Sequence, residues 1–276
     1  MFDEFKEQLF EILDREYPNG YIYPEIVPKL NGEKVGIKIL CEGCASPVLY
    51  MENLYQKYLE DGMNSVYELI KQATGMFASD EVVEWLKWEN ARKYLKPFVM
   101  NWEKNKECIV KGDKIAKPML DLILSCYLRI KYKSQIASIQ VTNKLLEAWE
   151  VSEEEVYEQA YCNEEYEIKP IGEILDSETL TDGWLLTNKE RIRGAAGMFS
   201  KQYLSQLAEQ CNSDLYILPS SIHEVIILKS EKCTYGVEHM KSVIDTVNEY
   251  MLSDEEFLSD SVYYYDRKKQ ELDIVK

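Results

Sequence analysis

Histidine is scarce in this chain of 276 residues, which contains two, His223 and His239. A catalytic zinc ion normally takes three protein ligands, and histidine is a common donor among them. His223-Glu224 begins the pattern of a zinc-protease helix, but the position four residues after His223 is Ile227, so the second ligand is missing. The sequence therefore argues against this class of metal site, and we expect no cofactor.

Glycine-rich phosphate loops and nucleophile elbows are also missing. Gly194 and Gly197 follow Arg193, but there is neither a Walker lysine nor a Gly-x-Gly-x-x-Gly pattern. The pair is better interpreted as two small residues at a close packing contact than as a phosphate-binding loop. The Gly-x-Ser-x-Gly elbow of α/β-hydrolases does not occur around the serines at 220 and 221.

Long apolar runs are lacking. No segment approaches the roughly 18–20 apolar residues that cross a bilayer. The opening MFDEFKEQLFEILDREY is acidic and interrupted, unlike a secretory signal, which has a basic start and an apolar stretch. With 46% hydrophobic residues the chain has the composition of a globular protein. We expect a soluble cytoplasmic protein without a membrane segment.

The seven cysteines form an odd set spread along the chain, which does not fit the disulfide framework of a short secreted domain. This distribution indicates a reducing compartment. Cys41-Glu-Gly-Cys44 has the spacing of a zinc knuckle or a redox pair, so both are weak metal candidates. A structural zinc site usually needs a second such pair, and the other cysteines are single. Two thiols on a turn is the favoured interpretation.

Basic residues are outnumbered, and the formal net charge is −17. Residues 147–178 contain twelve acids and one base, Lys169, and so contribute −11 of that charge. An acidic surface repels nucleic-acid phosphate, so nucleic-acid binding is disfavoured. The stretch is interpreted first as solvated helix faces; a partner-facing patch and a phosphate mimic are the alternatives.

The first third of the chain is predicted to be mainly helical with one hairpin. Asn31-Gly32 between two apolar runs is a strong hairpin signal. Pro24 and Pro28 lack amide donors, which places the first arm at a sheet edge. Apolar residues at helical spacing predict helices over 2–13, 49–60, from about 65, and around 80–95.

From about residue 95 the pattern changes toward strands. The segments 118–130 and 136–141 are predicted to pair as a hairpin, followed by two helices, the second opened by the capping box Ser152-x-x-Glu155. An acidic connector, strands at 184–188, 214–218 and 224–228, helices at 200–210 and 237–251, and a closing strand pair come next.

Hairpins mixed with helices, without regular alternation, predict an α+β fold. We expect two parts. Residues 1–94 form a mainly helical subdomain with a β-hairpin, and residues 95–276 form an α+β domain whose mixed or antiparallel sheet is packed with helices.

The segment ILPSSIHEVIIL, residues 217–228, gathers Ser220, Ser221, His223 and Glu224 between apolar runs. A serine nucleophile needs a base within hydrogen-bond reach and a third group that orients the base. Residues this close on a turn seldom satisfy that geometry. A strand–turn–strand whose hydroxyls bond nearby amides is therefore favoured over a catalytic site.

Several other polar residues are interesting. Asp121 is expected within an apolar strand, where an acid costs free energy unless it is paired or faces outward. Alternation places Tyr263 and Tyr265 on one side of their strand. The candidate functional surface comprises Asn188, Arg193, Ser220, Ser221, His223, Glu224, Asp260, Tyr263, Tyr265, Asp266 and Arg267.

Two strings are the most specific, Leu-Pro-Ser-Ser-x-His-Glu at 218–224 and Leu-Ser-Asp-x-Val-Tyr-x-Tyr-Asp-Arg at 258–267. With the LLTN and GAAGMF segments and much of the remaining chain, they resemble the domain of unknown function 5688 family. The resemblance implies a bacterial cytosolic protein with its most characteristic residues on these two segments. It implies no catalytic residues.

The leading functional hypothesis is a non-catalytic interaction or regulatory module whose partner is another protein. It follows from the poverty of nucleophile, metal and phosphate motifs and from the concentrated acids. A hydrolase or transferase that uses the serines, His223 and Glu224 is the first alternative. An acidic phosphate mimic that inhibits a nucleic-acid-binding protein is the second.

Overall fold

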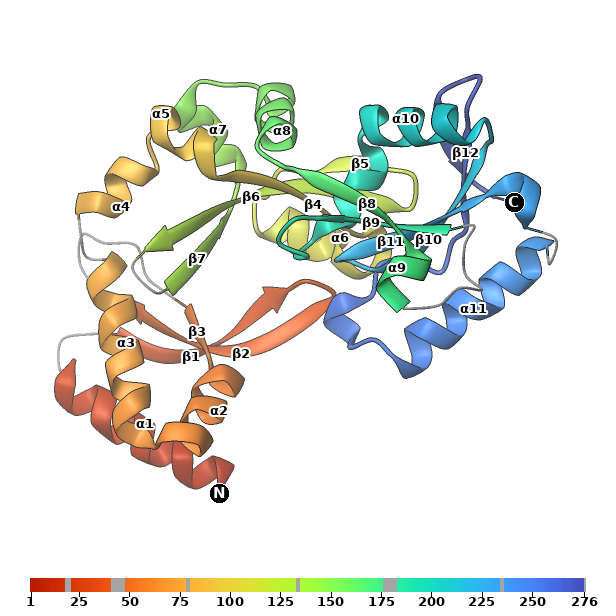
Figure 1. Cartoon of the computed structure of the whole chain (residues 1–276). Coiled ribbons are helices and arrows are strands. Elements are labelled where there is room, and N and C mark those ends of the chain that lie inside the picture. Colours follow the sequence, from red (N-terminus) through yellow and green to blue (C-terminus); the bar gives the residue numbers. More distant parts are fainter. Residues whose placement is uncertain are drawn as a thin grey trace. The chain divides into compact units, whose positions relative to one another are not determined.

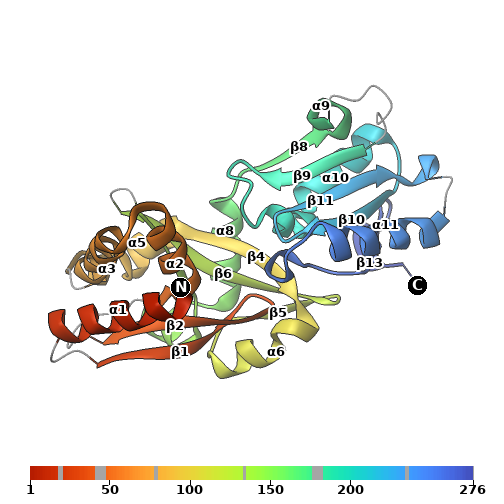
Figure 2. The same ribbon diagram turned by 90° about the horizontal axis from the view of Figure 1, so that it is seen from below.

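The computed structural model describes residues 1–17, 21–40, 48–77, 80–132, 135–175, 183–233 and 236–275. The chain divides into two compact units, Met1–Ala91 and Arg92–Lys276. Both units combine helices with antiparallel sheets, which confirms the α+β prediction (Figures 1 and 2). No described helix is long and apolar enough to span a membrane.

The first unit contains a three-stranded antiparallel sheet in the order β1-β2-β3. The predicted hairpin is confirmed, with β1 at the edge. Its two-residue connection is Leu30–Asn31, and Asn31 has a φ of 61°, a backbone region that asparagine tolerates. The strands are β1 (Tyr21–Lys29), β2 (Gly32–Leu40) and β3 (Val48–Tyr50).

The helices of this unit follow the apolar periodicity. The sequence did not predict that Leu49 lies on a strand, β3, and that the segment around 80–95 is broken at Leu86–Lys87. The core contains Phe5, Leu9, Leu13, Ile37, Met51, Leu54, Val66 and Ile70. The helices are α1 (Phe2–Glu16), α2 (Met51–Asp61), α3 (Met63–Phe77), α4 (Asp80–Trp85) and α5 (Trp88–Ala91).

The second unit opens with a 3₁₀ turn at Arg92–Tyr94 and contains two sheets. In the smaller sheet the central strand, β6, pairs with β4 along one side, and with both β5 and β7 along the other. The β6–β7 pair confirms the second predicted hairpin. The strands are β4 (Leu95–Asn101), β5 (Lys117–Met119), β6 (Leu122–Tyr132) and β7 (Gln135–Gln140).

The larger sheet has six antiparallel strands in the order β13-β12-β10-β11-β9-β8, and Figure 2 shows four of them, β8, β9, β11 and β10, side by side. The predicted closing pair, β12–β13, is confirmed. The expected acidic connector contains a strand, β8, and a short helix, α9 (Ile171–Leu175), which is a correction. The strands are β8 (Tyr166–Pro170), β9 (Gly183–Asn188), β10 (Leu215–Ser221), β11 (Glu224–Lys229), β12 (Tyr263–Asp266) and β13 (Glu271–Ile274).

The last long helix of this unit packs against the larger sheet through a narrow apolar face. In α11 the buried residues Met240 and Ile244 contact Leu218 of β10 and Val262. Val243 and Tyr250 belong to the apolar pattern of the same helix but are exposed, so the apolar arc of the helix is wider than its contact. The longer helices of this unit are α6 (Trp102–Lys111), α7 (Asn143–Trp149), α8 (Glu153–Cys162), α10 (Lys201–Cys211) and α11 (Gly236–Tyr250).

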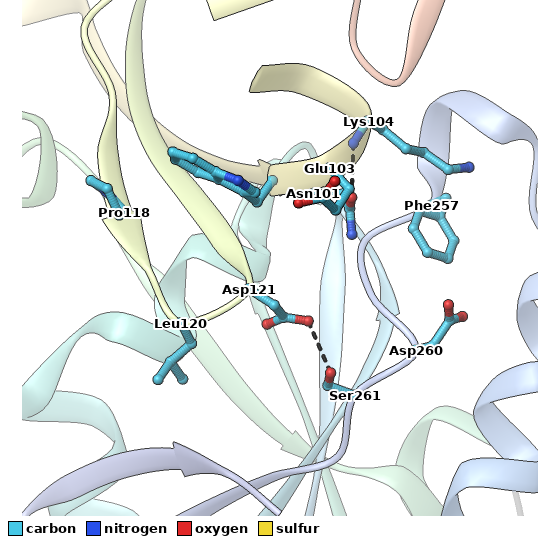
Figure 3. Close-up of a pocket in the computed structure, with 10 residues that line it drawn as sticks. Asn101, Glu103, Lys104, Pro118, Leu120, Asp121, Phe257, Asp260 and Ser261 are labelled. Atoms are coloured by element: carbon cyan, nitrogen blue, oxygen red, sulfur yellow. Dashed lines mark hydrogen bonds between the residues drawn. The ribbon is translucent and has the colours of Figure 1, made fainter. Parts of the chain in front are cut away.

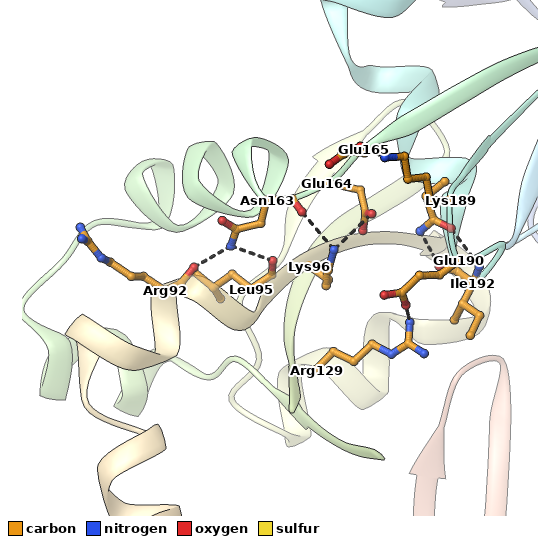
Figure 4. A network of polar contacts seen from close by, with 11 residues as sticks. Arg92, Leu95, Lys96, Arg129, Asn163, Glu164, Glu165, Lys189, Glu190 and Ile192 are labelled. Carbon is orange, nitrogen blue, oxygen red and sulfur yellow. Dashed lines mark hydrogen bonds and ion pairs between the residues drawn. The ribbon is translucent and has the colours of Figure 1, made fainter. Parts of the chain in front are cut away.

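The end of α8 is joined to the smaller sheet by a polar network (Figure 4). The Glu164 carboxylate is buried and lies 3.2 Å from the Nζ atom of Lys96 on β4. That ammonium also donates to the Asn163 carbonyl, and the Asn163 amide donates to the carbonyls of Arg92 and Leu95. Part of the acidic stretch is therefore structural.

Two further ion pairs belong to the same region. Arg129 of β6 pairs with Glu190, and Lys189 pairs with Glu165 (Figure 4). Glu190 and Lys189 follow β9, so both pairs connect the chain at the end of that strand with neighbouring segments. The larger sheet is thereby tied to β6 and to the segment between α8 and β8.

Replacing Lys96 with alanine leaves the Glu164 carboxylate buried without its cation, since that side chain is 5% exposed. We expect the free energy of unfolding to fall by about 3 kcal/mol. The control is Lys111→Ala, which removes a pair with Glu107 whose side chains are 73% and 79% exposed, and should cost less than about 1 kcal/mol. Urea unfolding followed by circular dichroism measures both, and equal losses would contradict the structural role of Glu164.

Candidate functional site

A partly buried cluster of hydroxyl groups surrounds one carboxylate in the second unit. The Oδ2 atom of Asp121 accepts hydrogen bonds from Ser259 Oγ at 2.6 Å and Ser261 Oγ at 2.9 Å. Its Oδ1 atom accepts from the Tyr263 hydroxyl at 2.6 Å. Burial, followed by the charge and hydrogen bond of Asp121, raises the pKa of Tyr263, so the phenol keeps its proton and remains a donor.

Asp121 is positioned by a tight turn and not by a strand. Leu120 and Asp121 connect β5 to β6, and Leu120 has a φ of 60°. The expectation of an acid inside an apolar strand is therefore wrong: the apolar run is divided into two strands at this point. The second condition that the sequence suggested, that the acid be paired, is met by the three hydroxyl donors.

Further hydrogen bonds join the start of α6 to the β5–β6 turn and to Leu258. The Asn101 side chain caps this helix by accepting from the Lys104 amide at 3.1 Å. The amide group of Asn101 also donates to the Leu258 carbonyl at 3.1 Å, and the Trp102 amide donates to the Asp121 carbonyl at 3.0 Å. The start of α6, the β5–β6 turn and the segment before β12 thus form one connected frame.

This frame surrounds an open cleft of about 530 Å³ (Figure 3). Trp102 is 36% exposed and Leu120 is 43% exposed, so two large apolar side chains of the lining meet solvent. The lining consists of Asn101, Trp102, Glu103, Lys104, Pro118, Leu120, Asp121, Phe257, Asp260 and Ser261.

A smaller hollow of about 330 Å³ adjoins this cleft and shares Lys104, Phe257 and Asp260 with it. The Lys104 ammonium lies 4.1 Å from the centroid of the Phe257 ring, at a cation–π distance. Figure 3 shows Lys104, Phe257 and Asp260 close together at this shared wall. The hollow is also lined by Asp245, Asn248, Glu249, Ser253 and Asp254.

The sequence did not single out Trp102, Lys104 or Phe257. The signal for Trp102 lies in the string WEKNKE, in which a large aromatic residue starts a charged helix and has polar residues three and four positions later. An aromatic side chain placed so has no apolar neighbours on its own helix face. Only the packing of other segments shows that it lines a hollow.

The His223 side chain is held locally. Its Nδ1 atom accepts from the Arg193 amide at 3.1 Å, and its Nε2 atom lies 3.9 Å from a carboxylate oxygen of Glu256. The His223 amide donates to Ser221 Oγ at 3.0 Å, and its carbonyl accepts from Thr187. Burial lowers the pKa of His223, against an opposing effect of Glu256, which favours a neutral imidazole.

The other candidate residues of the 217–228 segment differ in exposure. Ser221 is buried, whereas Ser220 and Glu224 are partly exposed. The Ile222 amide donates to the Glu256 carbonyl at 2.9 Å, so this turn contacts the segment that precedes Leu258. The two sequence strings that resemble the family are therefore neighbours in space.

Asn188 and Arg193 complete this turn region. The Asn188 side chain makes hydrogen bonds to both the amide and the carbonyl of Ile192. Arg193 has a φ of 56°, and its guanidinium lies 4.8 and 4.5 Å from the ring centroids of Phe98 and Tyr127. A Cβ atom at Gly194 would lie 2.5 Å from the Asn188 nitrogen, so glycine is required by close packing.

The tyrosines and charges of the last string are also structural. Tyr263 and Tyr265 share one side of β12 as predicted, but both are buried, which corrects their assignment to a surface. Asp266 accepts from the amides of Lys268 and Lys269, and these bonds lower its pKa. The Arg267 guanidinium donates to Asn212 at 2.7 Å. Asp260 alone among the predicted residues of this string is exposed and lines the cleft.

Cys41 and Cys44 lie outside the described residues. Among the residues that the structure describes, no group of three or more histidine, cysteine, aspartate or glutamate side chains is arranged to hold a metal ion.

Substituting Asp121 with asparagine replaces a charged acceptor of three hydroxyl bonds with a group that can accept through one oxygen. We expect a loss of about 2 kcal/mol in the free energy of unfolding. Asp260→Asn is the matched control, since this exposed side chain keeps its acceptor for the Asn248 amide, 2.8 Å away, and should lose less than about 0.5 kcal/mol. Chemical unfolding of both variants checks this, and an unaffected Asp121→Asn would contradict the role of the cluster.

The lowered pKa of His223 makes stability depend on pH. The folded chain binds this proton more weakly than the unfolded chain, whose histidine pKa is about 6.5, so stability present above that value is lost as the pH falls through the folded pKa. Between about pH 7 and about pH 5, the unfolding midpoint of the natural chain should fall more than that of His223→Asn. The control is His239→Asn, which removes the other histidine, an exposed one, and leaves the contacts of His223 in place. An equal fall in the natural chain and in His223→Asn would refute the assignment.

Comparison with known proteins gives a match to one protein family. No curated protein and no solved structure matches the chain. A family model described as DUF5688, a family of unknown function, matches residues 2–267 of the 276 residues. The match includes both strings on which the resemblance rested and confirms it. The chain therefore belongs to the DUF5688 family.

Proposed function

We propose that this chain is a non-catalytic protein-binding module and that the cleft between α6, the β5–β6 turn and residues 257–261 is its binding site. The observation that carries the proposal is the exposure of Trp102 and Leu120 on the walls of an open hollow. Aromatic side chains are enriched at binding hot spots because they contribute a large contact area with few rotatable bonds.

The frame around the cleft supports this role. The Asp121 cluster and the Asn101 contacts fix three separate segments by hydrogen bonds, so the exposed side chains are presented from a preorganised support. Preorganisation reduces the entropy that is lost when a partner binds.

The alternative catalytic site has weaker support. A nucleophile–base pair requires a hydrogen bond between the serine hydroxyl and the imidazole. The ring nitrogens of His223 face the Arg193 amide and the Glu256 carboxylate, and the Ser221 hydroxyl accepts from a backbone amide. These contacts favour a structural turn over a hydrolase or transferase.

The acidic stretch at 147–178 has a smaller part in this proposal than the sequence suggested. Glu164, Glu165 and Glu167 are engaged in ion pairs with lysines of the same unit. Up to Leu175, where the described part of this stretch ends, none of its acids lines either hollow. We therefore propose binding through the cleft and not through these acids. The phosphate-mimic alternative is weakened, because lysines neutralise part of the negative charge on which it depends.

A cytoplasmic location is part of the same proposal. The five cysteines that the structure describes, Cys108, Cys126, Cys162, Cys211 and Cys233, are free thiols. Free thiols are typical of proteins from reducing compartments.

Photo-crosslinking in cells that naturally make the protein tests the binding site. A benzophenone amino acid at position 102 should give discrete adducts with a partner protein. The same group at position 110 is the control, because Val110 lies on the same helix and is 81% exposed but does not line the cleft. Adducts at position 102 and none at 110 are expected, whereas no adducts at 102, or identical adducts at both positions, would contradict the proposal.

A further inference from the structure

We infer that the cleft and the adjoining hollow bind a polypeptide segment of the partner that carries lysine or arginine side chains. This inference rests on the proposed binding function and adds the chemical class of the partner. It is carried by the charge of the two linings, by the aromatic residues between the acids, and by the way the two hollows adjoin.

The charge of the combined lining is strongly negative. Six acids stand against one base, Lys104. Such a concentration of one sign in a concave surface attracts ligands of the opposite sign and accelerates their association. The six acids are Glu103, Asp121, Asp245, Glu249, Asp254 and Asp260.

These acids differ in what they can offer. Asp121 is surrounded by its three hydroxyl donors and contributes its charge from within the wall. Asp260 is exposed and lines both hollows, so its carboxylate is presented to an incoming group. Asp245 and Glu249 are exposed and extend the negative surface along α11.

The aromatic residues add a second, independent preference for cations. Lys104 already lies over the Phe257 ring at 4.1 Å, and Asp260 lines the same two hollows, so an ammonium stacked on an aromatic ring in an acidic hollow is part of the structure itself. Trp102, on the wall of the larger cleft, has the ring that binds cations best. An arginine or lysine side chain from a partner would find the same combination there.

The shape favours a segment over a single amine. The two hollows, about 530 and about 330 Å³, meet at Lys104, Phe257 and Asp260. A chain that crosses this shared wall can place different side chains in the two hollows. The apolar residues Pro118 and Leu120 line the larger one, where the aliphatic stems of long basic side chains can pack.

The experiment uses the full chain and defined peptides. A fluorescein-labelled octapeptide with lysine and arginine alternating with glycine is titrated at low salt, beside a neutral version with glutamine at the basic positions. The basic peptide should bind at least about tenfold more tightly. Trp102→Ala and Asp260→Asn should each weaken its binding by about three- to tenfold.

The matched control tests whether the affinity for the peptide depends on the position of the acids or on the overall charge of the chain. Glu154→Gln with Glu158→Gln removes two exposed charges from α8, outside both hollows, and should change the affinity by less than about twofold. An equal loss in this variant and in Asp260→Asn would overturn the inference, because the peptide would then be held by the general acidity of the chain.

The remaining outcomes separate this inference from the proposed function. Crosslinking at position 102 without a preference for the basic peptide would retain the binding module and overturn the basic partner. Spermidine is the second probe, and binding as tight as that of the peptide would overturn the assignment of a polypeptide ligand. A peptide preference that depends on Trp102 and Asp260 but not on Glu154 and Glu158 supports it.

Discussion

The carboxylate of Asp121 is the contact on which the second unit depends most. It accepts hydrogen bonds from Ser259, Ser261 and Tyr263, and so joins the β5–β6 turn of the smaller sheet to the segment that enters β12 of the larger sheet. A charged acceptor in a partly buried position is costly unless donors surround it, and strongly stabilising when they do. This requirement explains the spacing of the three donors, which stand at every second position from 259 to 263.

The cleft is a consequence of the same contact. Holding residues 257–261 against the start of α6 leaves Trp102, Leu120 and Phe257 on the walls of a hollow with Asp260 at its shared edge. The 217–228 turn is attached to this segment through the Ile222 amide and the Glu256 carbonyl. The two strings that mark the family are thus parts of one framework, and the residues available to a partner lie beside it.

Local patterns predicted much of the fold. The hairpins at 21–40 and 122–140, the helices with clear periodicity and the closing strand pair are confirmed, because turn chemistry and apolar spacing act over a few residues. The failures concern contacts between distant segments. The continuous apolar run around Asp121 gave no sign of the turn there, and the acidic run before β9 gave no sign of the strand β8. The periodicity of α11 did not show that Val243 and Tyr250 lie outside its contact with the sheet.

The sequence by itself determined the α+β class, the family, the acidity and the scarcity of catalytic motifs, since these follow from composition and short patterns. It also identified the two strings that resemble the family, but not the contacts that their residues make. Only the tertiary structure decided that Asp121 meets residues 138 to 142 positions later, and that Trp102 lines a hollow with Phe257. Hydrogen bonds between segments so far apart in the chain depend on how the sheets pack, and no local pattern encodes that packing.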